Sequence, residues 1–488
     1  MDSRELYMPN YMVYCVAISC LTSFCVGWTI GSPNIAGDIT HSCPTGNAHT
    51  ANPSFPDCLP MTTALWGFAV ASFCIGGLIG GICGGTVQMA LGRKKTIIIN
   101  AWGWIIGAIL IGLSVHTSMF IVGRIFCGLS CGLGSLATPT YIGEVSTIKA
   151  RGTMGTCHQF FIVIGILLSS VIGLPTSVVP LWRINFAIVA IPAIVQVIMM
   201  LTCVESPRWL ISMNRIDEAS EALKKLRGPN VDILLELFDI IEGQMGSAAA
   251  REKLSLPQEQ IHKEDYENPV TERREPLNVF QIFKDPVIRR IAFLVLFLHT
   301  FQQLSGMNAV MYFSTTVFKS AIDFQTAKYM TIATMGVNFL FTLVSVVMID
   351  RMGRRALFLI ATAGTCLFSV TLVLGSSFNV PVLMVISVFL YVASFAIGIG
   401  PIPWMITSEL TPIYASSSVG AAATAMNWAM NFLVGQVFPV VFAAIGGYSF
   451  LIFAGTSLFA FFVIFLTLPE TKGRPIEDIV KSFERRSS

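Results

Sequence analysis

The stretch LGRKKTIIINAWGWIIGAILIGLSV, residues 91–115, decides the fold of this chain. A basic turn is followed by about 20 residues without an acidic or basic side chain, the length that crosses a hydrocarbon core of about 30 Å. The whole chain has the same character: of its 488 residues 54% are hydrophobic and 12% are charged, and the mean hydropathy is +0.70. Soluble domains carry about 25% charged residues. The chain is therefore expected to lie in a membrane.

Eleven other segments have a similar length and apolar character. The twelve spans are expected at about 11–31, 62–88, 96–115, 119–141, 154–175, 183–203, 289–318, 328–349, 356–376, 382–408, 418–443 and 448–468. A helix satisfies its own backbone hydrogen bonds in lipid, so the expected fold class is an all-α membrane protein with twelve transmembrane helices. Twelve crossings put both termini on one side.

The basic residues predict which side that is. Connections on one side carry LGRKK (91–95), KAR (149–151), the long segment 205–287 and RMGRR (351–355). Connections on the other side are almost free of Lys and Arg, with Lys319 and Lys328 as exceptions. Basic loops stay in the cytoplasm, so both termini are expected there. The net charge of +3 is then a sign of topology and does not point to nucleic acid.

The first six spans and the last six repeat each other. The pairs that correspond are Gly92-Arg93 with Gly353-Arg354, Glu144 with Glu409, and Glu205 with Glu470. The two glutamates of each half are 61 residues apart. This predicts two pseudo-symmetric halves with a substrate site near the midplane between them. The expected division is an N-terminal half at 1–204, a cytoplasmic linker with amphipathic helices at 205–287, a C-terminal half at 288–470 and a short tail at 471–488.

Uncharged amides are the main polar groups inside the spans. They are Gln159, Gln302, Gln303, Asn308, Asn338, Asn427 and Asn431, whereas Arg124, His158 and His299 are the only ionisable residues away from span ends. An amide in lipid would lose its hydrogen bonds, so these are expected to face the interior or a water-filled path. Amides donate and accept, as sugar hydroxyls do, which favours a neutral polyol over an ion. The alternative is that they join helices to one another.

Three other residues are expected to shape this site. Gly306 lies between Gln303 and Asn308 and allows the helix to loosen there. Trp404 lies in GIGPIPWMITSEL (398–410), where two prolines predict a broken span, and its ring offers a flat face to a sugar. Tyr312 could close over substrate or simply pack.

The cysteines and the linker complete the reading from residues. Cys43 and Cys58 fall in the long outward connection 32–61, where a disulfide is allowed; the alternative is two free thiols. No phosphate-binding glycine loop or metal-ligand cluster occurs in the linker, so an ATP-driven pump is not supported. No cofactor, metal or enzymatic activity is expected.

The sequence resembles the sugar porter family of the major facilitator superfamily, which includes the facilitative glucose transporters. The motifs that carry the resemblance are GRKK, GRIFCG, GEVSTIKARG, HQF, VESPRWL, QQLSGMNAV, DRMGRR, GPIPW, SEL, MNWAMNF and PETKGR, which extend from about Gly27 to Arg474. The resemblance implies hexose transport by alternating access, in a monomer at the plasma membrane.

The resemblance also implies roles for individual residues. The implied sugar contacts are Gln159, Gln302, Gln303, Asn308, Asn338, Trp404 and Asn427, with Ile162 on the same helical face as Gln159. Tyr312, with Gly306, is implied in gating. The implied cytoplasmic salt-bridge network consists of Arg93, Glu144, Arg151, Glu205, Arg208, Arg354, Arg355, Glu409 and Glu470.

The sequence departs from the family pattern at several positions. Met89 and Ala90 precede GRKK, and Ser416 stands where an arginine is usual, so the cytoplasmic network is expected to be thinner. Ala396 stands where glucose-selective members carry a glutamate, which leaves fructose or mixed hexose transport open.

The first span predicts how transport is coupled. Proton-coupled relatives carry an aspartate where this chain has Thr29, and no interior carboxylate replaces it. Facilitated diffusion is therefore expected. A proton–hexose symporter that uses His158 or His299 is the nearer alternative, and a non-transporting sugar sensor is the more distant one.

Overall fold

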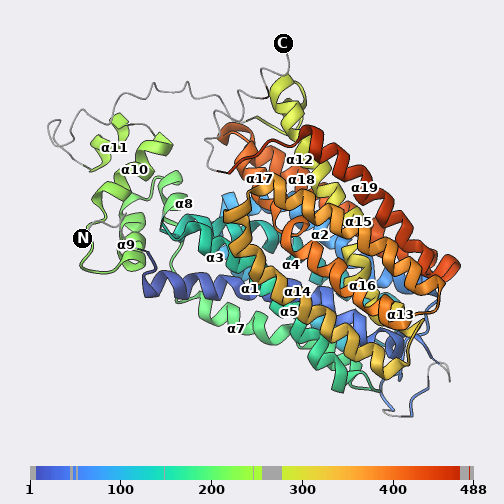
Figure 1. Ribbon diagram of the computed structural model, residues 1–488. Helices are drawn as coiled ribbons and strands as arrows, with labels where there is room; N and C mark the ends of the chain where they lie inside the picture. Colours follow the sequence, from blue (N-terminus) through green and yellow to red (C-terminus); the bar gives the residue numbers. More distant parts are fainter. Residues whose placement is uncertain are drawn as a thin grey trace.

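The computed structural model describes residues 7–43, 48–50, 53–147, 149–245, 247–254, 277–472 and 483. These residues form helices, with no strand among them (Figure 1). The first seven helices, here the N half, are α1 (Asn10–His41), α2 (Thr63–Leu91), α3 (Arg93–Gly112), α4 (Thr117–Val145), α5 (Arg151–Thr176), α6 (Trp182–Ala187) and α7 (Ala190–Met200).

The insert and the C half follow. The insert consists of α8 (Pro207–Ser212), α9 (Ile216–Arg227), α10 (Leu234–Met245) and α11 (Ser247–Leu254). The C half consists of α12 (Pro286–Leu304), α13 (Met307–Lys319), α14 (Phe324–Met352), α15 (Arg354–Ser377), α16 (Pro381–Ser394), α17 (Ile402–Leu410), α18 (Ile413–Ile445) and α19 (Phe450–Thr467). The turn Gln281–Phe283 precedes α12, and a π-helical turn, Phe395–Ile399, joins α16 to the region of α17.

The prediction of twelve transmembrane helices is confirmed. Eleven helical stretches of the described residues are long and apolar enough to cross a membrane. The last of these, Ser418–Thr467, contains both α18 and α19, which the turn Gly446–Ser449 separates, so the chain crosses twelve times. It is a multi-pass membrane protein.

The helices begin where capping groups favour it. Thr62 accepts a hydrogen bond from the Leu65 N–H at the start of α2, and Asp323 accepts one from Thr326 at the start of α14. Asp285 caps α12 in the same way, with Pro286 in the first turn. Gly92 and Gly353, both at φ +87°, make the sharp turns before α3 and α15.

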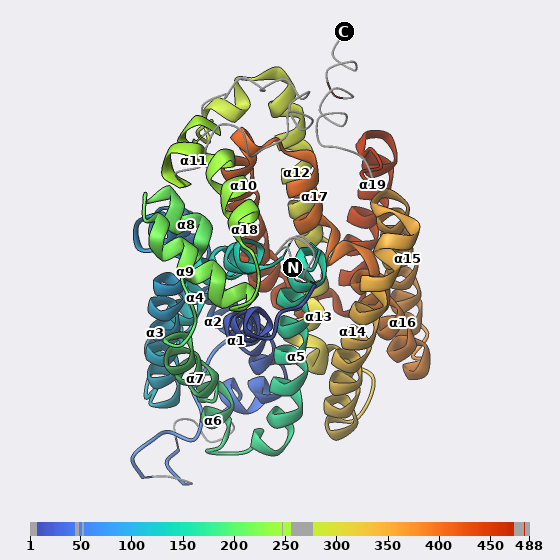
Figure 2. The ribbon, with the colours of Figure 1, turned by 90° about the vertical axis from the view of Figure 1, so that its left-hand side faces the viewer.

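The two ends of the bundle are named here by their connections. The loop end carries the connection between α1 and α2, and the insert end carries α8–α11. In Figure 2, α3 and α7 of the N half lie on one side, α15, α16 and α19 of the C half lie on the other, and the insert lies beyond the helix ends. The halves meet through α2 with α18, α5 with α14, and α1 with α13.

The first span is longer than predicted. The sequence reading ended it near residue 31 and placed 32–61 in a loop, but α1 continues to His41. Asn34 and Thr40 are buried, and Asn34 and Asp38 contact α13, so tertiary contacts hold these turns in place. The remaining connection contains a disulfide between Cys43 and Cys58.

The apolar core differs between the two ends. At the loop end one cluster joins both halves, from Trp28 and Phe73 to Tyr312 and Trp428. At the insert end each half has a separate cluster of buried residues. In a membrane, close van der Waals packing and hydrogen bonds between helices hold the helices and the halves together. The halves therefore cohere at the loop end.

Candidate functional site

The seventh span breaks at Gly306, which lies between α12 and α13. Its φ of +90° is left-handed, and a Cβ atom there would collide with the Phe453 ring, so glycine is required on both grounds. The break separates Gln302 and Gln303, at the end of α12, from Asn308 in α13.

The structure brings four of the predicted amides into one hydrogen-bonded chain. Asn308 donates to Gln303, whose Nε2 donates to Asn427 Oδ1 at 2.9 Å. The Nδ2 of Asn427 donates to Gln302 Oε1 at 2.7 Å, and Gln302 Nε2 donates to Gly400 O at 2.6 Å. Each amide in the chain is buried or partly buried. These four amides offer hydrogen-bond donors and acceptors and carry no net charge.

Two prolines explain why side chains bond to the backbone of the tenth span. Helical carbonyls bond to the N–H four residues later, and proline has none. Pro401 and Pro403 therefore leave the carbonyls of Ile397 and Ile399 without helical partners. Ser345 Oγ donates to Ile397 O at 3.0 Å, and the Gln302 amide donates to Ile399 O at 3.1 Å. The predicted broken span is thus tied to α12 and α14.

His299 connects the amide chain to Trp404. Thr407 Oγ1 donates its only proton to Pro403 O, so His299 Nε2 must donate to Thr407, at 3.1 Å. The His299 and Trp404 rings meet edge to face, with centroids 4.6 Å apart, and Trp404 is 40% exposed. On its other side His299 Nδ1 lies 3.5 Å from Asn427 Nδ2, so one side chain separates Trp404 from the chain of amides.

The other predicted contacts come from both halves. Gln159 and Ile162 are half-buried on α5, and Asn338 is buried on α14. The Phe160 and Phe339 rings, one residue beyond Gln159 and Asn338, lie 5.5 Å apart. The two amides therefore stand on facing helices from opposite halves.

Tyr312 lies on the loop side of the amide chain. Its hydroxyl donates to Asn431 Oδ1 at 2.7 Å, and its ring meets the edge of Phe73 in the N half at 5.9 Å. Tyr312 is 1% exposed. It belongs to the core that joins the halves.

The sequence reading missed Asn34. Its Nδ2 donates to Met311 O and Ser314 Oγ, both at 2.8 Å, and its Oδ1 accepts from the Thr315 N–H at 3.1 Å. An amide directly after Pro33, within an otherwise uncharged stretch, was the available signal. One N-half side chain thus bonds to three residues of α13.

At the insert end, the corresponding charges form two separate clusters. In the first, the N cluster, Arg93 Nη2 lies 2.9 Å from Glu144, and the Arg93 and Lys94 N–H groups donate to Glu205 at 2.9 and 3.0 Å. Ser206 donates to Glu144. All these residues belong to the N half or to the start of the insert.

The second cluster, the C cluster, repeats the first. Arg354 lies 3.1 Å from Glu409, and the Arg354 and Arg355 N–H groups donate to Glu470 at 2.8 and 3.0 Å. Thr471 donates to Glu409, as Ser206 does to Glu144. Among the described residues, the hydrogen bonds and ion pairs between the halves all lie at the loop end.

Two members of the predicted network stand apart. Arg208 is exposed at the start of α8, and within the described part of the chain it makes no ion pair. The side chains of Arg151 and Ser416 lie outside the described residues.

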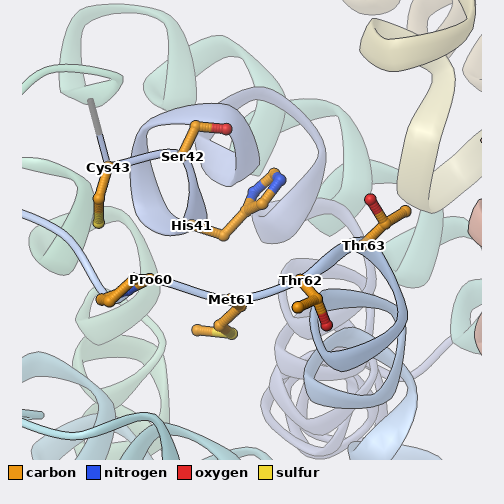
Figure 3. Close-up of a pocket in the computed structure, with 7 residues that line it drawn as sticks. All are labelled: His41, Ser42, Cys43, Pro60, Met61, Thr62 and Thr63. Atoms are coloured by element: carbon orange, nitrogen blue, oxygen red, sulfur yellow. The ribbon is translucent and has the colours of Figure 1, made fainter. Parts of the chain in front are cut away.

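A cavity of about 540 Å³ opens at the loop end, away from these groups. It is lined by His41, Ser42 and Cys43 at the end of α1 and by Pro60–Thr63 before α2 (Figure 3). None of the predicted sugar contacts lines it.

Comparison with known proteins decides the family. The family model described as sugar (and other) transporter matches residues 15–483. The chain belongs to the sugar transporter family. It is 37% identical to the mouse solute carrier family 2, facilitated glucose transporter member 4, over 89% of this chain and 83% of that protein. It is 35% identical to the rabbit member 3 over 98% and 93%.

A solved structure confirms the fold of this sugar transporter. The proton:xylose symporter XylE from E. coli, a major facilitator superfamily protein bound to 6-bromo-6-deoxy-D-glucose, superposes with a TM-score of 0.73. The match covers 98% of this chain and all of XylE, at 23% identity. The sugar transporter therefore has the major facilitator fold, here with its halves joined at the loop end.

Proposed function

We propose that this transporter carries a hexose, with D-glucose as the first candidate, by facilitated diffusion. The observation that carries the proposal is the chain of buried amides from Asn308 to Gln302. These groups bond to one another and to backbone, so a sugar hydroxyl can replace an amide partner by another hydrogen bond without uncovering a charge. The relatives named facilitated glucose transporters support the same substrate class.

The proposed sugar site uses both halves. The proposed contacts are Gln302, Gln303, Asn308, Asn338, Trp404 and Asn427 from the C half, with Gln159 and Ile162 from the N half. Tyr312 would move with α13 as a gate, and Gly306 would act as its hinge. Closure of one end while the other opens would alternate access to the sugar.

The charge pattern supports an orientation for this cycle. The insert end, with its basic turns, would face the cytoplasm, so that both termini are cytoplasmic and the disulfide lies outside. The proposed location is the plasma membrane, with the monomer as the working unit. The N and C clusters would add bonds across the insert end when it closes.

Arg124 supports uniport over symport. Its Nη1 donates to Thr29 O and its Nη2 to Val70 O, both at 2.8 Å, and its guanidinium lies 4.8 Å from the Phe73 ring centre. In the described spans its hydrogen bonds go to backbone carbonyls, with no carboxylate that could exchange a proton beside it. The alternative, a proton-coupled symporter, would have to use His299 or His158, which bonds to Ser23 at 2.7 Å.

The tenth span leaves the choice among hexoses open to test. Ala396 is 3% exposed in the π-helical turn Phe395–Ile399. A methyl group at this position offers no polar contact to a sugar. Competition between glucose and fructose therefore belongs in the first assay.

The test is uptake of labelled D-glucose into proteoliposomes with and without an inward proton gradient. A uniporter equilibrates the sugar in both cases, whereas accumulation driven by the gradient would establish the symporter. Gln302→Leu is expected to reduce uptake at least about a hundredfold, because the sugar and the backbone carbonyls of Ile399 and Gly400 would all lose a hydrogen-bond donor. Gln325→Leu, at an exposed position in the first turn of α14, is the matched control. Normal uptake by Gln302→Leu would contradict the proposed site.

A further inference from the structure

Two lysines break the charge pattern of the spans, and the structure places both at the loop end. Lys319 ends α13 and lies 2.6 Å from Asp38 of α1; the two side chains are 49% and 21% exposed. A cavity of about 380 Å³ opens beside this ion pair, and Asp38, Lys319 and Phe324 are among the residues that line it. An exposed pair of this kind contributes about 0–1 kcal/mol.

Lys328 is different because it is buried. It lies in the second turn of α14 and is 4% exposed. Its Nζ donates to the hydroxyl of Ser177, the residue that ends α5, at 2.7 Å. The same ammonium lies 4.3 Å from the centre of the Phe324 ring.

The Lys328 contact crosses from one half to the other. Each pair of helices that joins the halves has at least one polar contact of this kind at the loop end, for example Asn34 with Thr315 for α1 and α13, Gln436 with Ala64 O for α18 and α2, and Lys328 with Ser177 for α14 and the end of α5. Of these contacts, only Lys328 places a charge in a buried position.

A contact between the halves can exist only while the loop end is closed. In that state Lys328 has a hydroxyl acceptor and an aromatic face, and a hydrogen bond from a charged group is stronger than one between neutral groups. When the end opens, both partners are lost and water replaces them. The desolvation cost of the ammonium opposes closure and reduces the gain from these two contacts.

We propose that Lys328 is a gating residue that holds the loop end closed through Ser177. The inference deepens the proposed transport function, since it names a residue that sets the balance between the two open states. It gives a role to a buried lysine at the end of the bundle whose connections carry few basic residues.

The test is hydrogen–deuterium exchange of the full chain in nanodiscs. Lys328→Met keeps the apolar stem and removes the ammonium, and it is expected to speed exchange about three- to tenfold in peptides from the loop-end turns of α5, α13 and α14. Ser177→Ala should act in the same direction by a smaller factor. The double variant should exceed Lys328→Met by less than the product of the two single effects. Lys284→Met, exposed at the insert end, is the control.

Exchange that is unchanged or slower at the loop end in Lys328→Met would overturn the proposal, and slower exchange would mean that the buried charge drives opening. Acceleration throughout the chain, including α9, would also overturn it, because general destabilisation would then explain the effect. Lys328→Arg, which keeps a charged donor, should restore part of the protection.

Sugar uptake separates this proposal from the proposed function. If the wild-type chain carries hexose, Lys328→Met should lower the half-saturating concentration at the loop face and raise it at the insert face. A wild-type chain that carries no hexose would contradict the transport proposal, and the exchange measurement would still decide the role of Lys328.

Discussion

The N cluster and the C cluster are built from the same parts and differ in how they are held. In each, a glycine at φ +87° turns the chain so that successive N–H groups point at one glutamate, while an arginine reaches a second. The ion pair of the N cluster is the less exposed, at 10% and 17% for Arg93 and Glu144, against 13% and 26% for Arg354 and Glu409.

The electrostatics of the two N–H-bound glutamates diverge. Burial raises the pKa of Glu205 above its ordinary value of 4.5, and the backbone N–H groups that bind it offset this only in part. Burial also acts to raise the pKa of Glu470, but there the backbone N–H donors outweigh it and the pKa falls below 4.5. The charged form is thus disfavoured in one cluster and favoured in the other.

Three tyrosine hydroxyls bond to the residues just before Glu205 of the N cluster. The hydroxyl of Tyr141 donates to Val204 O at 2.8 Å, that of Tyr11 donates to Thr202 O at 2.6 Å, and that of Tyr14 bonds to Thr202 Oγ1. In the described part of the chain, no tyrosine hydroxyl bonds to the residues just before Glu470. Backbone N–H groups hold both glutamates, and tyrosine hydroxyls give the segment just before Glu205 an additional support.

The largest effects are expected from the two turn glycines. Gly92→Ala and Gly353→Ala each force an L-residue to positive φ and push a Cβ atom into Glu205 or Glu470. Each should cost about 1–3 kcal/mol of stability, with Gly92 the worse because its added Cβ atom would lie closer to the glutamate and would also meet the Trp209 ring. Thermal unfolding of the purified protein measures this. Gly85→Ala, which meets open space, is the control, and equal loss in all three variants would refute the argument.

Replacing each N–H-bound glutamate by glutamine should have the next largest effect, and the loss of stability should differ between the two clusters. At pH 7 Glu470→Gln should destabilise by about 1–2 kcal/mol, because it removes a favoured charge from its N–H donors. Glu205→Gln should cost less than half of this, because burial already disfavours its charge. The exposed Glu221→Gln serves as the control. A larger loss for Glu205→Gln would mean that the clusters do not differ in this way.

The two variants should respond differently to pH, because the pKa of Glu205 lies above 4.5 and that of Glu470 lies below it. With its raised pKa, Glu205 takes up a proton in the folded protein above pH 4.5, where the unfolded chain still carries the charge, so the wild type gains stability as the pH falls from 7 towards 4.5 and its advantage over Glu205→Gln should grow. With its lowered pKa, Glu470 contributes stability above pH 4.5 that is lost only as the pH falls through its folded value. Unfolding midpoints measured from pH 7 to 4 test this, and parallel curves would contradict it.

A smaller effect than that of Glu470→Gln is expected from the tyrosine contacts. Tyr141→Phe removes one hydrogen bond to Val204 O and should cost about 0.5–1.5 kcal/mol. The exchange of the Ser206 N–H should quicken, while peptides around Glu470 stay unchanged. Tyr329→Phe, at a 55% exposed position, provides the comparison. An equal response in both clusters would show that the tyrosines act globally.

Hydropathy was enough to predict the spans, and internal repetition indicated that Gly92, Glu144 and Glu205 correspond to Gly353, Glu409 and Glu470; the resemblance implied that such charges interact. Each span is long enough to cross a membrane by itself, and residues such as Gly92 and Gly353 recur at corresponding span ends. The last turns of α1 could not be predicted in this way. Asn34 and Asp38 are polar, and they are helical because they bond to α13, which lies more than 270 residues away in the sequence.

The candidate site was predicted as a set of residues, and its connections were not. The sequence indicates that Gln302 and Asn427 are polar residues within apolar membrane spans, but it does not indicate that they form a hydrogen bond with each other. Nor could it indicate which end of the bundle is closed, since the same residues must serve both states. That information lies in contacts such as the one between Lys328 and Ser177.

The prolines of the tenth span make its shape depend on what Gln302 binds. At present the Gln302 amide serves the Ile399 carbonyl that Pro403 leaves without a helical partner. A sugar that draws this amide away must leave the carbonyl to water or to one of its own hydroxyls. Sugar binding and the bonding of the Ile399 carbonyl therefore compete for the same Gln302 amide. A ligand that takes this amide and offers no second hydroxyl would leave the carbonyl to water.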